Sequence, residues 1–270
     1  MKVVILCGGI GTRLREETEY RPKPMVDIGG KPILWHIMKI YAHYGYSDFV
    51  LCLGYRGSMI KEYFLNYESM VSDFSITLGK HEGQIQYHNA HEEKSFSVTL
   101  VETGLETLTG GRLKRVEKYI PDDAFMMTYG DGLADINLRK LVDFHFSHGK
   151  IATITAVHPT SRFGKMDIDG NGTVRQFSEK PLTEDWINGG FFVFNRKVFE
   201  YLEDDGAFEQ EPLRNLTRDG QLKAFLHTGF WYAMDTYREY LYLNELWNKQ
   251  QAEWRIWDQE MKTGKSAGSL

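Results

Sequence analysis

Short apolar runs alternate with amphipathic stretches along this chain, and the alternation predicts βαβ units around a mostly parallel sheet. The first run, residues 3–7, is apolar at successive positions and therefore fits a strand that is buried on both faces. A helix is expected between Pro32 and Gly45, because apolar residues recur there at helical spacing. A second buried strand is expected over 49–53 and a helix over 57–67.

The rest of the chain contains segments with a different pattern. Residues from about 73 to 101 hold short, turn-bounded runs that predict an antiparallel β insertion, and residues 165–194 predict β hairpins. Because no repeat or linker interrupts residues 1–257, we expect a single α/β domain there, followed by a polar tail at 258–270 that frays. The other expected elements are strands at 124–129 and 151–157 and helices at 109–120, 137–148 and 236–249.

Composition and charge narrow the functional classes. The 270 residues include 32 Lys and Arg against 37 Asp and Glu, a net charge of −5, so the chain lacks the basic field that gives non-specific affinity for nucleic acid. Cys7 and Cys52 both lie inside apolar runs, which excludes a disulfide framework and suits a reducing compartment. The chain shows neither a secretory signal nor an apolar run long enough to cross a bilayer. We therefore expect a cytoplasmic protein that binds neither membrane nor nucleic acid.

Residues 8–13 (Gly-Gly-Ile-Gly-Thr-Arg) are the first candidate for chemistry, because they join a predicted strand to a predicted helix. Glycines let the backbone turn sharply and bring N–H groups close to an anion, which favours a phosphate-binding loop. Two common loops of this kind are disfavoured. The chain lacks the Gly-Lys-Ser/Thr of a P-loop, and Leu14 stands where the dinucleotide-binding motif needs a glycine. A tight structural turn is the alternative.

Basic residues gather around the same turn. Phosphate favours guanidinium and ammonium groups beside a glycine-lined backbone, and Pro22 and Pro24 stiffen the segment that presents Lys23. Glutamates within residues 16–19 partly neutralise the stretch, so a solvated surface is the alternative. The basic residues are Arg13, Arg15, Arg21, Lys23 and Lys31.

Two aspartates from distant segments are candidate metal ligands. Asp131 follows a predicted buried strand, so its carboxylate should project at the carboxyl edge of the sheet, where ligands of open α/β sheets bind. Asp235 stands at the start of the last predicted helix. Two carboxylates can share one Mg²⁺ together with phosphate oxygens. A Gly-Asp-Gly turn and a helix N-cap are the respective alternatives.

Later segments offer candidate contacts to a phosphate group and to the hydroxyl groups of a ligand. Lys180 ends a predicted strand, where it can reach a phosphate, although a surface ion pair is the alternative. The amide of Asn188 and the backbone at Gly189 and Gly190 suit contacts to hydroxyl groups of a ligand, and a strand bulge is the alternative there. His88 and His91 have no third ligand at a recognisable spacing, so we predict no metal site from them. Cys7 has no paired histidine motif and is expected to be inert packing.

These motifs, taken in chain order, resemble the signature of the sugar-phosphate nucleotidylyltransferases. Residues 8–14 followed by 21–25 (Arg-Pro-Lys-Pro-Met) carry the likeness, which extends to about residue 248. Residues 109–115 (Thr-Gly-Gly-Arg-Leu-Lys-Arg) resemble the glucose-1-phosphate cytidylyltransferase branch, whereas thymidylyl relatives usually carry Gly-Leu-Ala-Gln in that region. The other matching motifs are residues 29–33, 128–131, 179–181 and 188–190.

The resemblance implies a fold and a reaction. The fold is a Rossmann-like three-layer α/β fold, in which helices flank a mixed, mostly parallel sheet with antiparallel β insertions. The reaction joins CTP and α-D-glucose 1-phosphate to give CDP-glucose and pyrophosphate, with Mg²⁺ as cofactor. The resemblance also implies a homo-oligomer that supplies sugar nucleotides for surface polysaccharides such as lipopolysaccharide O-antigen.

The resemblance also implies roles for particular residues. Arg13 holds the departing phosphates, Lys23 contacts the phosphates being joined, and Asp131 and Asp235 hold Mg²⁺; these four are the expected catalytic residues. The expected sugar-phosphate contacts are Glu179, Lys180, Asn188 and Gly189. Thr107 and Arg112 are the expected base-recognition residues. The full expected nucleotide site is Leu6, Cys7, Gly8, Gly9, Ile10, Gly11, Thr12, Arg13, Lys23, Thr107, Arg112 and Gly130.

Two alternatives remain at this point. The same chemistry with UTP, dTTP or another sugar phosphate is the first, and a catalytically silent protein that only binds sugar nucleotides is the second. The joint presence of Asp131, Asp235, Lys23 and Lys180 favours an enzyme, because a binding protein does not need the metal pair.

Overall fold

The computed structural model describes residues 1–78, 85–89, 91–161, 163–179 and 181–258. Within them the central element is an eight-stranded sheet in the order β13-β10-β14-β8-β1-β4-β7, with β15 also paired to β10. β1 (Val3–Leu6) lies inside the sheet, parallel to both β4 (Asp48–Leu53) and β8 (Ala124–Tyr129). The predicted Rossmann-like α/β fold, with helices flanking a mixed and mostly parallel sheet, is confirmed.

One half of the sheet is mixed in direction. β14 (Phe192–Asn195) runs antiparallel to β8 and to β10 (Ala152–Val157). β15 (Leu222–His227) runs parallel to β10, and β13 (Ile187–Asn188) pairs with β10 in the antiparallel sense. The sequence pattern predicts β hairpins over residues 165–194. The prediction is wrong for β13 and β14, which belong to the central sheet.

The predicted antiparallel insertion near residues 73–101 is only partly correct. β5 (Phe74–Ile76) and β6 (Ile85–Tyr87) do form an antiparallel pair. β7 (Ser97–Glu102), however, runs parallel to β4 at the end of the strand order of the central sheet. An edge strand is only partly buried, so its apolar residues alternate with polar ones much as in an antiparallel strand. The pattern alone therefore did not reveal the direction of β7.

Helices cover both faces of the sheet, so that alternate residues of β1 pack into different clusters. Val3 and Ile5 pack in a cluster that includes apolar side chains of α2 (Ile33–His43), α3 (Gly57–Leu65) and α6 (Leu138–His148). Val4 and Leu6 pack in the cluster that includes α5 (Thr109–Arg115) and α7 (Glu211–Arg218). Burial of β1 on both faces, predicted from its apolar run, is confirmed.

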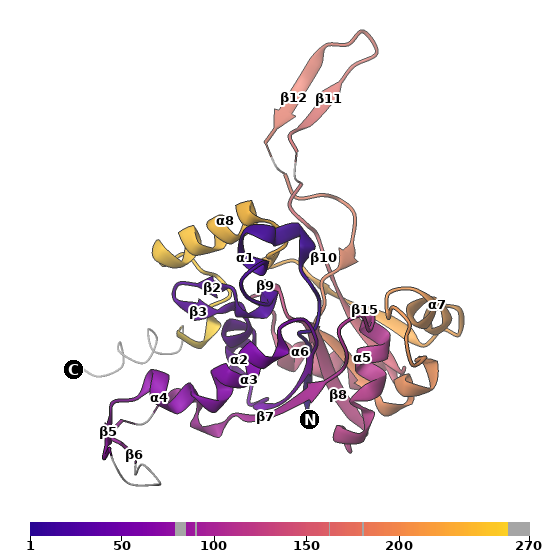
Figure 1. The fold of residues 1–270 in the computed structure, drawn as a ribbon. Helices are drawn as coiled ribbons and strands as arrows, with labels where there is room; N and C mark the ends of the chain where they lie inside the picture. The colour runs from indigo at the N-terminus through magenta and orange to yellow at the C-terminus, as the bar shows by residue number, and fades with distance from the viewer. Residues whose placement is uncertain (79–84, 90, 162, 180, 259–270) are drawn as a thin grey trace, which may run out of the picture.

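The remaining elements are short, apart from one helix. The helix predicted over 109–120 ends at Arg115 and is followed by a 3-10 turn, Glu117–Tyr119. The hairpin of β11 (Lys165–Ile168) and β12 (Val174–Ser178) projects away from the body of the molecule (Figure 1). Residues 259–270, most of the tail expected to fray, lie outside the described residues. The other elements are α1 (Arg15–Thr18), α4 (Tyr67–Val71), α8 (Tyr237–Asn248), β2 (Asp27–Ile28), β3 (Lys31–Pro32), β9 (Gly132–Ala134), β16 (Trp231–Ala233), and the 3-10 turns Thr12–Leu14, Lys23–Met25, Glu92–Ser95, Arg196–Tyr201 and Ile256–Asp258.

Helix α8 contacts two segments of the chain that contribute residues to the site, the turn after Lys23 and the residues around Asp235. The side-chain oxygen of Asn244 accepts a hydrogen bond from the backbone N–H of Gly29 at 3.0 Å, and its amide nitrogen donates to the carbonyl of Asp27 at 3.3 Å. These bonds fix the turn that follows Lys23. The N-terminal end of α8 comes directly after Asp235, so the same helix borders Asp235 and holds the turn that follows Lys23.

Candidate active site

A cavity of about 360 Å³ opens at the carboxyl ends of β1 and β8. Ligands of open α/β sheets bind at this edge. The predicted glycine loop forms one part of its wall, and the start of α5 forms another. Ile10, which is 47% exposed, does not belong to the lining. The lining residues are Leu6, Cys7, Gly8, Gly9, Gly11, Thr12, Arg13, Lys23, Pro24, Thr107, Leu108, Thr109, Arg112, Tyr129, Gly130 and Asp131.

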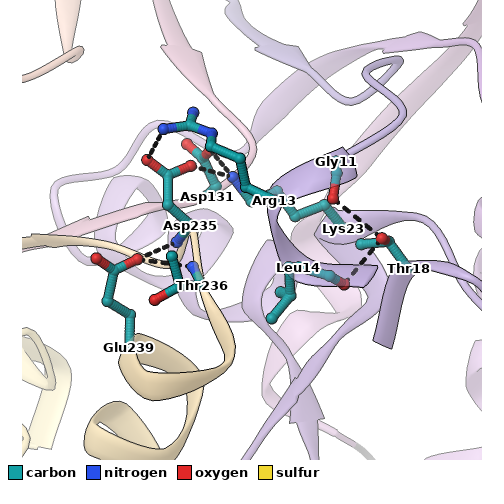
Figure 2. Close-up of polar contacts among 9 residues, drawn as sticks. All are labelled: Gly11, Arg13, Leu14, Thr18, Lys23, Asp131, Asp235, Thr236 and Glu239. Carbon is teal, nitrogen blue, oxygen red and sulfur yellow. Dashed lines mark hydrogen bonds and ion pairs between the residues drawn. The ribbon is translucent and has the colours of Figure 1, made fainter. Parts of the chain in front are cut away.

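Two positions of the loop require glycine. A Cβ atom on Gly8 would lie 2.0 Å from Nη1 of Arg112, so only glycine permits this approach. Gly11 has φ +70°, in the left-handed region that glycine adopts without strain. The hydroxyl of Thr18 lies 3.0 Å from the carbonyl oxygen of Gly11 and 2.9 Å from that of Leu14, and Figure 2 shows it between them. Thr18 thus fixes the end of the loop.

Two aspartates and two cations form a compact cluster beside this loop (Figure 2). The Lys23 ammonium donates to Oδ2 of Asp131 and to Oδ1 of Asp235, both at 2.6 Å. The guanidinium of Arg13 lies 2.8 Å from the second oxygen of Asp235. Burial alone would lower the pKa of Lys23, but the two carboxylates outweigh it and raise that pKa above its ordinary value. The ammonium is therefore charged at neutral pH.

The convergence of the two aspartates follows from local pairing. Asp131 lies between β8 and β9, and Asp235 follows β16, which pairs with β9 in the antiparallel sense. The backbone N–H of Met234 donates to the carbonyl of Asp131 at 2.9 Å and continues this ladder. Glu239 accepts hydrogen bonds from the backbone N–H groups of Asp235 (2.6 Å) and Thr236 (2.8 Å). Thr236, not Asp235, is the N-cap of α8, so the carboxylate of Asp235 points to the cluster instead.

The carboxylate pair fits a hard divalent cation. Mg²⁺ is usually bound by one or two carboxylates, with phosphate oxygens and waters completing its shell. Asp131 and Asp235 already converge on a single cation, the Lys23 ammonium, which shows that their oxygens can face one positive charge. Among the described residues no group of three or more His, Cys, Asp or Glu side chains has the arrangement of a metal site. Asp131 and Asp235 are the residues that would hold Mg²⁺.

The expected sugar-side residues are brought close to the cavity only in part. The side-chain amide of Asn188 donates to the hydroxyl of Tyr129, a lining residue, at 3.0 Å. The carbonyl of Gly189 accepts a hydrogen bond from the indole of Trp231 at 2.8 Å. Glu179 follows β12 of the projecting hairpin and is not part of the cavity lining, and Lys180 lies outside the described residues.

Comparison with known proteins identifies the family. Residues 2–249 match the family model described as "Nucleotidyl transferase". The chain belongs to this family. It is 52% identical over 261 residues to the glucose-1-phosphate cytidylyltransferase of Salmonella typhi, which covers 96% of this chain and 100% of that protein. It is 49% identical over 259 residues to the probable glucose-1-phosphate cytidylyltransferase of Bacillus subtilis, which covers 95% and 100%. The resemblance to sugar-phosphate nucleotidylyltransferases is thereby confirmed.

Solved structures place this nucleotidyl transferase among similar folds. The crystal structure of HddC from Yersinia pseudotuberculosis complexed with GMP-PN has a TM-score of 0.67 and 26% identity, and covers 91% of this chain and 99% of that one. The inositol-1-phosphate CTP transferase from T. maritima has a TM-score of 0.65 with 17% identity over 96% of each chain, which shows likeness of fold alone. No helix in the described part of the chain has both the length and the apolar character needed to span a bilayer.

The environment of Arg112 in this nucleotidyl transferase differs from the one expected of a residue that recognises the nucleotide base. Its side chain is buried, with 4% exposure, and its guanidinium makes five hydrogen bonds within the protein. Base recognition by Arg112 stays a prediction, whereas the bonds show that it fixes residues 103–105 against the glycine loop. The acceptors are the carbonyls of Leu53, Gly104, Leu105 and Gly8 and the hydroxyl of Thr103.

We expect Arg112→Lys to lower the free energy of unfolding by about 2–4 kcal/mol, since lysine lacks the planar fork and leaves buried carbonyls unpaired. Urea denaturation measures this change. Arg115→Lys is the matched control. Arg115 is exposed and donates to the Thr103 carbonyl (2.6 Å) and to the Thr107 hydroxyl (2.7 Å), so its loss should be below about 1 kcal/mol. Equal losses in the two variants would contradict the assignment of Arg112 as the residue that fixes this loop.

The structure also identifies residues of the nucleotidyl transferase site that the motifs did not reveal. Thr18 fixes the end of the glycine loop, and Tyr129 forms part of the cavity wall. Glu239 accepts a hydrogen bond from the backbone N–H of Asp235. A signal for Glu239 was present, because Thr236 followed three residues later by glutamate is a capping-box pattern. Cys7 lines the cavity, but burial holds the pKa of its thiol well above the usual range, which agrees with an inert thiol.

Proposed function

We propose that this nucleotidyl transferase makes CDP-glucose and pyrophosphate from CTP and α-D-glucose 1-phosphate. The bacterial relatives that match nearly its full length carry names for this activity, which supports the choice of nucleotide and sugar phosphate. The observation that carries the chemistry is the Lys23 ammonium, held between Asp131 and Asp235 on the wall of the glycine-lined cavity. This arrangement suits the transfer of a nucleotidyl group between phosphates.

The reaction is a direct displacement at the α-phosphorus of the nucleotide. An oxygen of the sugar phosphate attacks that phosphorus and forms the new P–O bond. The bond from the α-phosphorus to the oxygen shared with the β-phosphate breaks, and pyrophosphate leaves with the electron pair. The nucleophile arrives as an anion, so the enzyme needs no covalent intermediate. Catalysis is then positioning and neutralisation of phosphate charge.

We assign the residues of the cavity separate roles in this reaction. The backbone of the glycine loop approaches the nucleotide, Arg13 holds the β- and γ-phosphates, and Lys23 neutralises charge at the phosphates being joined. Asp131 and Asp235 would hold Mg²⁺, which when bound supplies further positive charge for the phosphates. On the sugar side, Asn188 and Gly189 are proposed to meet the hydroxyl groups, and the sequence assigns Lys180 to the sugar phosphate.

Two further expectations stay predictions. The first is a homo-oligomer, which is supported by the exposed apolar side chains of α8: Tyr237 (41%), Leu241 (51%) and Tyr242 (39%). The second is cytoplasmic location, together with the use of the product for surface polysaccharides.

Pyrophosphate release from a panel of nucleotides and sugar phosphates tests the proposed function. Cytosine carries a 4-amino donor and an N3 acceptor, whereas uracil reverses both, so a cavity built for cytosine leaves polar groups unpaired with UTP at a cost of about 1–3 kcal/mol each. We therefore expect CTP to exceed UTP and dTTP by at least about tenfold in kcat/KM. Release without CTP preference would refute the cytidylyl assignment, and no release with any pair would refute the enzyme.

A further inference from the structure

Glu209 joins two parts of the cavity wall that are far apart in the sequence. Its carboxylate accepts a hydrogen bond from the hydroxyl of Thr109 and another from the hydroxyl of Tyr129, both at 2.6 Å. Thr109 and Tyr129 line the nucleotide cavity, at the start of α5 and at the end of β8. Hydroxyl-to-carboxylate bonds of this length are charge-assisted and strong. The Thr109 hydroxyl also accepts from the backbone N–H of Phe208 at 2.8 Å, which locks the link.

The same link reaches the sugar side with a fixed direction of donation. Oδ1 of Asn188 accepts from the backbone N–H of Gly190 at 2.9 Å, so the amide nitrogen must be the atom that donates to Tyr129 at 3.0 Å. Because Asn188 only donates to this phenol, the proton of Tyr129 is directed to Glu209.

We propose that Glu209 is a positioning residue of the transferase site, which orients Asn188 through Tyr129 and holds the nucleotide wall through Thr109. The inference rests on the proposed function for the identity of the two substrates. Asn188 has a second amide proton beyond the one given to Tyr129, and the fixed direction of donation determines where that proton points. One carboxylate thereby contacts the nucleotide wall through Thr109 and the sugar-side amide through Tyr129.

A purely structural brace makes a different prediction from a positioning residue. A brace affects the stability of the fold and treats both substrates alike. The proposed relay instead divides into two arms, one from Glu209 to Thr109 and one from Glu209 through Tyr129 to Asn188. Variants that cut one arm should therefore affect one substrate.

The first test separates KM for glucose 1-phosphate from calorimetric binding of Mg·CTP. Tyr129→Phe should raise that KM about 3- to 10-fold, the effect of one lost hydrogen bond, and leave CTP binding within about twofold. Thr109→Val should do the reverse, and Glu209→Ala should impair both. Glu211→Ala is the control, because Glu211 is ion-paired with Arg214 at 3.0 Å on the surface of α7, and it should change neither quantity.

The second test is a double-mutant cycle between Glu209→Gln and Asn188→Ala. The two residues share Tyr129 as hydrogen-bond partner, so their effects on KM for glucose 1-phosphate should be non-additive by at least about threefold. In a Tyr129→Phe background the same pair should become additive. Additivity in the wild-type background, or Tyr129→Phe affecting both substrates equally, would overturn the relay and leave Glu209 as a brace.

These results are distinguishable from failure of the proposed function. If the unaltered protein prefers another nucleotide or sugar phosphate, the proposed function fails, and both tests are run with the preferred pair, because the relay does not depend on the base. If it turns over no pair, the cycle is measured by calorimetric binding of glucose 1-phosphate and CTP separately. An additive result in either format refutes the relay alone.

Discussion

Asp131→Asn is expected to lower kcat at least about 100-fold while changing KM for glucose 1-phosphate by less than about threefold. Asparagine keeps the shape of the side chain but removes the charge from an oxygen that lies 2.6 Å from the Lys23 ammonium. The cation cluster and the proposed Mg²⁺ site both lose an anionic partner, and the sugar side is left unaltered. Initial rates of pyrophosphate release at saturating Mg²⁺ measure the effect.

Asp235→Asn should behave in the same way, since Asp235 contacts both Lys23 and Arg13. The double variant should be less than additive, because both carboxylates serve one cation. Asp135→Asn is the matched control. Asp135 lies four residues beyond Asp131 and faces His227 at 3.1 Å, so turnover should stay within about twofold of the unaltered enzyme. If Asp131→Asn or Asp235→Asn turns over at a near-normal rate, the aspartate that was replaced is not a catalytic residue.

Local sequence patterns predicted the parts of the fold and site that depend on neighbours in the chain. The apolar run of β1 requires burial on both faces, and the structure buries all four of its residues. Gly8 and Gly11 marked the loop because glycines allow a sharp turn close to an anion, and the structure shows a close approach of Arg112 at Gly8 and a positive φ at Gly11. Asp131 was placed at the sheet edge because it follows a buried strand, and its carboxylate does line the cavity. The site roles of these residues remain predictions.

Features of the fold and site that depend on contacts between distant segments could not be predicted from the sequence. The direction of β7 is decided by its pairing with β4, and nothing within residues 97–102 specifies that direction. Arg112 was assigned to the base because it stands in a family motif, but two of its five acceptors, the carbonyls of Leu53 and Gly8, belong to distant segments of the chain. Glu209 meets Tyr129 across a separation of 80 residues. Side-chain contacts of this kind follow only from the folded geometry.

Lys23→Met is expected to lower kcat and to raise the affinity for a divalent metal. Both effects follow from the position of the Lys23 ammonium between the two aspartates. The ammonium donates to Asp131 and Asp235 at 2.6 Å each, so it occupies the position of a cation that both carboxylates share. A divalent metal that binds these carboxylates must compete with it. Without the ammonium, the two facing carboxylates lose the cation that they share, although Asp235 keeps its contact with Arg13, and the pair attracts metal more strongly.

We therefore expect Lys23→Met to lower kcat at least about 100-fold, since the charge nearest the reacting phosphates is gone, and to raise divalent metal affinity without nucleotide about tenfold or more. Electron paramagnetic resonance titration of Mn²⁺ measures the affinity, and pyrophosphate release measures kcat. Lys31→Met is the control, because the ammonium of Lys31 lies over the Trp35 ring, 5.8 Å from its centroid, and it should alter neither quantity. Asp131→Asn should weaken Mn²⁺ binding instead. If Lys23→Met weakens it as well, Lys23 supports the metal site and does not compete with the metal, and the shared-cation geometry has no functional counterpart.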